Sequence, residues 1–596
     1  MYTALDSANH EIRILDIFPG QPGSPISCAV RHTRLLSGST IPYTSLSYVW
    51  GRPSLSTPIT FNGVQVPVTV NLAAALDHVR SATETVTYWA DALCINQEDN
   101  VEKSAQVAMM GDVYREGTGT RIWLGEERDG SDLAMDLIAQ MDGEDLASER
   151  NRFDEEGLRA IAHLQAREWW SRVWVIQEAL LSKASIIQCG NKSLPISAFI
   201  RLDDIRREWY RSSRRYIGVR SGSLIPNNPF SSILTAFPDE VIRLRTGRQS
   251  SLMDWITSTE DFHATNPRDK IYALLSLSPP LDTAGVVPDY NATVAEVYAA
   301  VTAHCIIRDR DLLVLHFDAD EKSDEHGLPS WIRDYSSSGL LGKKPMYVPF
   351  SPHVYAACGR DSRGRKKLSV AGLFSEDFLE LRSRGVIVDS VVYAGRNERL
   401  KPYTGIDLLE RLANVKERSA RTLANIKLWE EKFEGVDRSP YDSEEGRGTA
   451  FWRTLIANRS FGEWAPLPSE TVENIYFETW MGKLPLPESE VELQLPHADV
   501  DEVKRLYVKP FTDACITRCH GRSFIITSKG YIGIAPLKTE TGDVVVVLEG
   551  GDVPYVLRGL DGGGYKFIGE SYIHGIMEGE ALEGKGTDDL QVLVLK

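Results

Sequence analysis

The chain has 596 residues, of which 42% are apolar and 25% are charged, which is typical of a folded globular protein and excludes wholesale disorder. Its 83 acidic residues outnumber 66 basic ones, giving a formal net charge of -17 that argues against general binding to nucleic acids or anionic membranes. A chain of this length exceeds what a single hydrophobic core usually serves, so we expect several domains.

Cysteine content and the amino terminus indicate the compartment. Seven cysteines are sparse and odd in number, unlike the dense frameworks of secreted domains, and this favours a reducing environment. The first residues lack a basic segment followed by an apolar one, and no run approaches 18 apolar residues. We therefore expect a soluble, cytoplasmic protein with no membrane span.

The first predicted elements are short strands. Residues 11–50 read as strands and turns, and residues 59–68 predict a hairpin about Asn62-Gly63, because both turn residues tolerate positive φ. Residues 71–80 predict a helix with Asn71 as its N-cap.

An alternation of strands and helices follows. Strands are predicted over 85–90, 119–126 and 184–190, and helices between them over 101–117, 131–141 and 155–167. This pattern predicts a mostly parallel sheet with helices on both faces.

Polar side chains crowd the end of the predicted strand 85–90. Asp91, Asn96 and Gln97 follow it directly, and in open α/β sheets ligands bind at the carboxyl ends of the strands. We therefore take these three as candidate ligand-binding residues, with Asp91 also a candidate catalytic carboxylate. Alternatively, Asp91, Asn96 or Gln97 caps the loop through backbone N–H groups.

Other side chains near this loop have competing interpretations. Trp50, next to Gly51, is a candidate for lining a cleft, although a tryptophan is more often part of the core. Glu102 is a candidate ligand contact or a member of a solvated helix edge. Cys94 is interpreted as a small buried thiol and not as a nucleophile.

Glu178 is the second candidate catalytic residue. If residues 169–181 form one helix, Trp174 and Leu181 lie on the same apolar face as Glu178. Burying an unpaired carboxylate is costly, so this group needs a partner, a raised pKa or a ligand. The structural alternative is an ion pair with Arg172 or another arginine.

Three blocks resemble a known family. "YTSLSYVWG" (43–51), "YWADALCINQEDNVEKSAQVAMMGDVYREGTGTRIWLG" (88–125) and "REWWSRVWVIQEALL" (167–181) resemble the fungal heterokaryon incompatibility (HET) domain in order and spacing, over a core of about 40–185. "NPRDKIYALLSL" (266–277), "LPSWIRDY" (328–335) and the glycine-spaced carboxyl-terminal strands resemble segments that commonly follow this domain. Ala90 departs from the bulky aliphatic residue that the family more often has before the aspartate.

The resemblance implies a role in fungal nonself recognition, as an effector of regulated cell death. The HET domain is distantly similar to the TIR domain, so the resemblance also implies a TIR-like, flavodoxin-like fold. It further implies NAD as a substrate, with Glu178 as the matching carboxylate and Trp174 as a ligand-binding neighbour. The alternative function is a non-enzymatic signalling or scaffold protein that acts through self-association of the HET domain or binding of a protein partner.

Four regions are predicted from these patterns. They are a HET domain over 1–195, a mainly helical middle region over 196–435, a loop and helical connector over 436–510, and a β-rich module over 511–596. A locally basic stretch, 201–220, reads as a solvated helix face and not as a nucleic-acid surface. No metal ligand set and no firm cofactor is predicted.

Overall fold

The structure is a computed structural model that forms two compact units, Met1–Thr293 and Val294–Lys596. The boundary falls inside the predicted middle region of 196–435. Of the basic stretch 201–220, all but 201–205 lies outside the described residues, as does most of the predicted connector 436–510. The described residues are 2–35, 41–52, 54–141, 154–205, 251–260, 262–283, 285–317, 326–336, 355–359, 368–397, 408–442, 446–458, 514–516 and 518–596.

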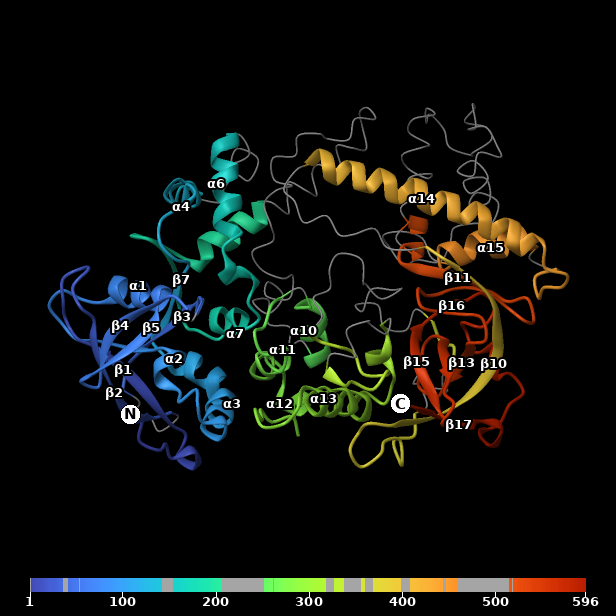
Figure 1. The fold of residues 1–596 in the computed structure, drawn as a ribbon, viewed down its shortest axis with the longest axis horizontal. Helices are drawn as coiled ribbons and strands as arrows, with labels where there is room; N and C mark the ends of the chain where they lie inside the picture. Colours follow the sequence, from blue (N-terminus) through green and yellow to red (C-terminus); the bar gives the residue numbers. More distant parts are fainter. Residues whose placement is uncertain are drawn as a thin grey trace. The chain divides into compact units, whose positions relative to one another are not determined.

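The first unit, which begins at the blue end of the chain in Figure 1, is built on a nine-stranded sheet with the order β5-β4-β2-β1-β6-β3-β7-β8-β9. Its strands are β1 (Glu11–Ile17), β2 (Ser27–Arg34), β3 (Thr44–Tyr48), β4 (Ser56–Phe61), β5 (Val64–Thr69), β6 (Val86–Trp89), β7 (Gly119–Trp123), β8 (Ser185–Cys189) and β9 (Lys192–Pro195).

The predicted parallel arrangement holds at the centre of this sheet. Strands β6, β3, β7 and β8 are parallel neighbours, with Thr44 opposite both Tyr88 and Gly119. The sheet as a whole is mixed, because β1 pairs antiparallel with β2 and β6, and the pairs β4–β5 and β8–β9 are hairpins. A two-residue turn joins only antiparallel strands. The β4–β5 turn confirms the predicted hairpin, with Asn62 at φ 51° and Gly63 at φ 80°.

Helices cover both faces of the central strands, as predicted. Ser47 and Tyr48 of β3 stand opposite Ile122 and Trp123 of β7, and successive residues of a strand point to opposite faces. The Trp123 indole donates to Asn71 of α1 (Val70–Val79), whereas the Ser47 hydroxyl donates to Glu178 of α7 (Val175–Leu180). Helices α1 and α7 therefore lie on opposite faces.

The remaining helices of the first unit connect and flank these strands. Helix α3 packs against α7, and α4 packs against α6. Their bounds, with those of the shorter helices, are α2 (Asp91–Cys94), α3 (Asn100–Glu116), α4 (Ser131–Ala139), α6 (Glu155–Gln165), η3 (Glu168–Ser171), α10 (Leu252–Ser258), α11 (Asp269–Tyr272) and α12 (Pro280–Thr283).

Two local predictions were wrong. The N-cap of α1 is Thr69, whose hydroxyl accepts a hydrogen bond from the Leu72 N–H at 3.4 Å. Asn71 lies inside the helix, and its amide donates instead to the Val49 carbonyl oxygen at 2.6 Å. The predicted helix 169–181 is broken into η3 and α7, because the Val173 N–H leaves the helical pattern and donates to the His263 carbonyl oxygen at 3.0 Å.

The second unit holds an eight-stranded sheet that closes into a β-barrel-like module. Its order is β13-β14-β15-β17-β10-β11-β12-β16, and a further pairing of β13 with β10 completes a ring. The strands are β10 (Leu381–Arg396), β11 (Arg522–Thr527), β12 (Ile532–Pro536), β13 (Val544–Leu548), β14 (Tyr555–Gly559), β15 (Tyr565–Glu570), β16 (Tyr572–Ile573) and β17 (Gln591–Leu595).

Strand β10 comes from the predicted mainly helical middle region, yet it pairs with β17, β13 and β11 in turn. The strand is irregular between Ile387 and Asp389, within its pairing with β13, and between Val391 and Tyr393, within its pairing with β11. Val391 joins a buried apolar core with Ile525, Val545 and other side chains of the module. Among the described residues, the longer helices of this unit are α13 (Val294–Asp309), α14 (Leu408–Glu434) and α15 (Arg447–Leu455).

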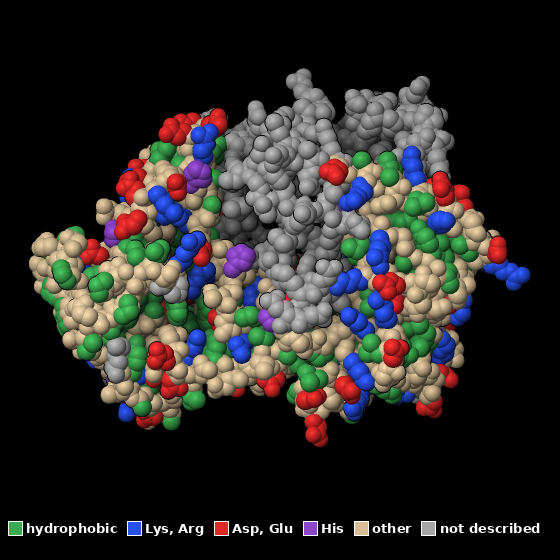
Figure 2. Space-filling view, in the orientation of Figure 1, with side chains coloured by type: hydrophobic (Ala, Val, Ile, Leu, Met, Phe, Trp, Pro, Cys, Tyr) green, Lys and Arg blue, Asp and Glu red, His purple; other side chains and the backbone are tan. Residues whose placement is uncertain are grey.

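Surface charge and helix length relate to two predictions, that the protein binds no nucleic acid and that it has no membrane span. Figure 2 shows acidic and basic side chains interspersed over the described residues of the face in view. Across the described ranges, no helix combines the length and the apolar character needed to cross a membrane.

Candidate functional site

A cavity of about 710 Å³ opens at the carboxyl ends of two parallel strands of the first unit. Trp50 and Gly51 follow β3, and Asp91 and Gln97 follow β6, and all four line the cavity. This is the end of a parallel sheet at which ligands bind, and the volume suits a small-molecule site. The predicted polar loop therefore borders a cavity of the right kind.

Asp91 is held in place at the rim of this cavity. The Trp50 indole donates to Asp91 Oδ2 at 2.7 Å, and the Ala92 N–H donates to Oδ1 at 2.8 Å. Burial raises the pKa of Asp91, and the positive charge of Arg172 opposes that shift. Asp91 thus caps its own loop, as the structural alternative expected, and also faces the cavity.

The two amides of the loop are placed differently. Gln97 Nε2 donates to the Asp91 carbonyl oxygen at 3.1 Å, while its buried Oε1 has no hydrogen-bond partner among the described residues. Gln97 lines the cavity, but this oxygen is enclosed and is not exposed to it. Asn96 does not appear in the described lining, and its Oδ1 accepts from the Glu98 N–H at 3.3 Å, which makes it a loop cap.

Glu102 and Cys94 take structural positions. Glu102 forms a two-pronged ion pair with the fully buried Arg13, at 2.6 and 2.9 Å, and also accepts from the Asn96 N–H at 2.7 Å. Within the described lining of the cavity, Glu102 does not occur. Burial raises the pKa of the Cys94 thiol to about 12, in agreement with its interpretation as an inert buried thiol.

Glu178 is buried behind the cavity. Its carboxylate accepts a hydrogen bond from the Ser47 hydroxyl, and Ser47 Oγ in turn accepts from the Trp169 indole at 2.7 Å. Burial raises the pKa of Glu178 to about 7, with Arg172 opposing the shift and the charge of Asp91 adding to it. The two predicted carboxylates, far apart in the chain, therefore act on each other.

Arg172 links the buried carboxylate to the cavity, which it lines. It occupies the break between η3 and α7 with extended backbone, and its guanidinium donates to the Tyr48 carbonyl oxygen. Its charge favours the ionised forms of both Asp91 and Glu178. In the described part of the chain Glu178 and Arg172 form no direct ion pair, so the predicted structural alternative is not what the geometry shows.

Sequence reasoning missed the wall of the cavity formed by residues 263–269 and Tyr290. The predicted ligand-binding residue Trp174 lines the cavity and contacts this wall, because its indole donates to Asp269 Oδ2 at 3.0 Å. The Tyr290 hydroxyl donates to Asp269 Oδ1 at 2.6 Å, and Lys103 Nζ lies 4.4 Å from the centre of the Tyr290 ring. The block 266–277 was the sequence signal for this wall, because it resembles a recurrent segment of the family, but nothing in its spacing predicted a contact with Trp174.

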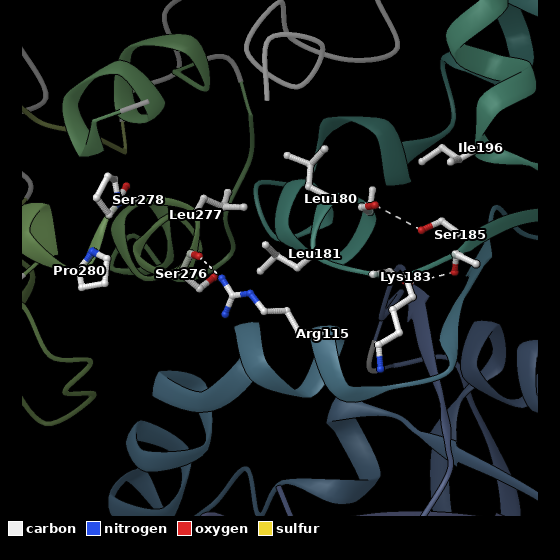
Figure 3. A pocket seen from close by; sticks show the side chains of 14 residues that line it. Arg115, Leu180, Leu181, Lys183, Ser185, Ile196, Ser276, Leu277, Ser278 and Pro280 are labelled. Atoms are coloured by element: carbon white, nitrogen blue, oxygen red, sulfur yellow. Dashed lines mark hydrogen bonds between the residues drawn. The ribbon is translucent and has the colours of Figure 1, made fainter. Parts of the chain in front are cut away.

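A second cavity, of about 560 Å³, lies at the opposite ends of the strands, beside Ser185 at the start of β8 (Figure 3). The guanidinium of Arg115 is engaged by the Ser276 carbonyl oxygen at 2.5 Å and by Asp112 at 2.9 Å. Lys183 Nζ donates to the Glu116 carbonyl oxygen at 3.2 Å. We place the candidate site in the larger cavity, because that one lies at the carboxyl ends of the parallel strands and is lined by Asp91, Gln97 and Trp174.

Comparison with known proteins agrees with the residues of this site. Residues 43–178 match the family model described as heterokaryon incompatibility protein (HET), and residues 496–593 match that of the Het-6 beta-barrel domain. Heterokaryon incompatibility protein 6, OR allele, of Neurospora crassa is 26% identical over 694 aligned residues, covering 99% of this chain and 97% of the relative. No solved structure matches. The resemblance found in the sequence is confirmed: the chain matches the HET family model and the Het-6 beta-barrel model over these residues.

Proposed function

We propose that this protein acts in fungal nonself recognition and triggers cell death by hydrolysing NAD in the cavity beside Asp91. The full-length similarity to a heterokaryon incompatibility protein supports the biological role. The observation that carries the chemical part is the cavity itself, in which a held carboxylate, an arginine and two tryptophans meet at the ligand-binding end of a parallel sheet.

The strand order favours a TIR-like arrangement of the HET domain. Numbered among themselves in chain order, the parallel strands β3, β6, β7 and β8 lie in the order 2-1-3-4. Flavodoxin-like sheets begin with the same order and bind their ligand where the order reverses, between the first and third strands. In this chain that point lies between β3 and β7, whereas the cavity lies at the ends of β3 and β6, so the strand order supports the TIR-like arrangement and not the position of the cavity.

The side chains suit the chemistry of NAD cleavage. The bond between the nicotinamide nitrogen and the ribose breaks with its electron pair on nicotinamide, and water supplies the new oxygen and releases a proton. The ribose passes through a positively charged, oxocarbenium-like state that a carboxylate stabilises. Asp91 lines the cavity and takes that role, and Gln97 lies beside it in the lining.

In this proposal Glu178 is a positioning residue. It lies outside the described lining of the cavity and accepts from Ser47, and the charge of Arg172 favours its ionised form. Arg172 in turn faces both the cavity and the Asp91 carboxylate.

Asp91→Asn is expected to reduce nicotinamide release from NAD by about 100-fold or more, because it removes the negative charge that the developing cation needs. Asparagine keeps the size of the side chain and an oxygen for the Trp50 indole, so the fold should persist. The measurement is nicotinamide release by the purified full chain at high protein concentration. Asp136→Asn, at a side chain that is 54% exposed on α4, is the matched control and should release nicotinamide like the unaltered chain.

A different result would favour the scaffold function. If the unaltered protein releases no nicotinamide, even when crowded, while its overexpression still arrests growth, the enzymatic proposal fails. The same holds if Asp91→Asn releases nicotinamide at the unaltered rate.

A further inference from the structure

The cavity has a wall that lies outside the matched HET domain. Residues 263–269 and Tyr290 line it, whereas the family match ends at residue 178. The inference below deepens the proposed function and rests on it, since it concerns how the same cavity holds a nucleotide.

This wall is firmly attached to the HET domain. The backbone of His263 pairs with that of Arg172, through the His263 N–H to the Ser171 carbonyl oxygen at 2.5 Å and the Val173 N–H to the His263 carbonyl oxygen at 3.0 Å. This backbone pairing fixes the position of the loop 263–269 relative to Arg172, which lies at the break between η3 and α7. A ligand group on this wall is therefore preorganised.

The buried Lys270 stabilises the backbone just before the loop 263–269. Its side chain is 4% exposed, and its Nζ donates to the carbonyl oxygens of Thr259, Glu260 and Phe262 at 3.0, 2.9 and 2.7 Å. A lysine has three N–H donors, and each of these has a backbone acceptor. Asp269, the preceding residue, is thereby fixed at the edge of the cavity.

The carboxylates of Asp269 and Asp91 are arranged alike. Each is half-buried, lines the cavity and accepts one indole N–H, from Trp174 in one case and Trp50 in the other. Each oxygen of Asp269 accepts a single described hydrogen bond, from Trp174 and from Tyr290, so lone pairs remain for a ligand donor.

The charges around Asp269 identify the class of ligand. Lys103, Arg172 and Arg268 line the same cavity, together with the acidic Glu168, and the charges of Lys103 and Arg172 act on Asp269. Cations suit phosphate oxygens, and a carboxylate suits the hydroxyls of a ribose, as in dinucleotide sites. A phosphorylated ribose satisfies both kinds of group at once.

We propose that Asp269 is a substrate-binding carboxylate that accepts hydrogen bonds from the ribose hydroxyls of a nucleotide in this cavity, opposite Asp91. The wall formed by residues 263–269 and Tyr290 is thus part of the binding site, which it forms together with residues of the HET domain. The alternative is a purely structural role, in which Asp269 only connects Trp174 and Tyr290 through hydrogen bonds. A structural role affects the stability of the fold but does not make the protein distinguish ligands that differ by one hydroxyl.

The test uses ADP-ribose and its analogue lacking the 2-hydroxyl of the terminal ribose, with binding to the full chain measured by calorimetry. Removing a hydrogen bond to a charged group typically weakens binding by about 10- to 100-fold. We expect the unaltered protein to bind the deoxy analogue more weakly by that factor. Asp269→Asn should bind ADP-ribose about as weakly and lose the discrimination, while the control Asp136→Asn retains both.

The outcomes separate the two proposals. Binding with discrimination but no nicotinamide release supports the role of Asp269 and overturns the hydrolytic function. Equal affinity of the unaltered protein for both ligands, or undiminished discrimination by Asp269→Asn, overturns the role of Asp269 alone. No binding of ADP-ribose or NAD overturns both. If Asp269→Asn does not fold, equal affinity of the unaltered protein for the two ligands still overturns the role of Asp269.

Discussion

Glu102→Ala is expected to lower the free energy of unfolding by about 3–5 kcal/mol, the typical cost of removing one partner of a buried ion pair. Arg13 is 0% exposed, and two of its hydrogen bonds, at 2.6 and 2.9 Å, go to the Glu102 carboxylate. Without Glu102 the guanidinium keeps the carbonyl oxygens of Thr3 and Cys94 but has no counter-charge. Chemical denaturation of the full chain measures the loss.

Two further variants make this prediction specific. Glu98→Ala, at an exposed side chain four positions earlier, should change the unfolding free energy by less than about 0.5 kcal/mol. Replacing the pair together, by Arg13→Met with Glu102→Leu, should recover most of the stability, because no buried charge remains. If Glu102→Ala unfolds like the unaltered chain yet no longer binds nucleotide, the ligand role predicted from sequence is correct and the structural one is wrong.

Glu178→Gln is expected to change how stability depends on pH. Burial raises the pKa of Glu178 in the folded state from 4.5 to about 7, so the folded protein binds this proton more tightly than the unfolded chain. The stabilising contribution is complete below pH 4.5 and is lost as the pH rises through about 7. Glutamine carries no such proton, so between these limits the variant should gain about 3 kcal/mol relative to the unaltered protein.

The measurement is the unfolding free energy of both proteins from pH 4.5 to 8. Glutamine keeps an oxygen to accept from the Ser47 hydroxyl, so the packing around it should survive. The variant should retain some pH dependence of the same sign, because burial also raises the pKa values of Asp91 and Asp269. Parallel curves for the two proteins would show that Glu178 is not protonated in the folded state over this range.

Local patterns predicted the central strands and one border of the cavity. The period of apolar residues located β6, β7 and β8, and the polar loop after β6 supplied Asp91 and Gln97 to the cavity. These features depend on neighbours in the chain, and short-range rules describe them well.

Long-range contacts explain what sequence reasoning missed. Helix 169–181 breaks because His263 offers a backbone partner at Arg172, and Asn71 is no N-cap because its amide is bonded to Val49. The contact between Trp174 and Asp269 joins residues 95 positions apart. Strand β10 pairs with strands more than a hundred residues later, so its own stretch carried too little information to place it.

The long pairing of β10 has a practical consequence for gene fragments. The recognised barrel region begins at residue 496, but the strand that closes the ring spans Leu381–Arg396. A coding segment cloned from residue 496 onward would leave β13, β17 and β11 with bare edges, which invite pairing between chains. Such a product should collect in inclusion bodies, whereas one that starts before residue 381 carries its own closing strand.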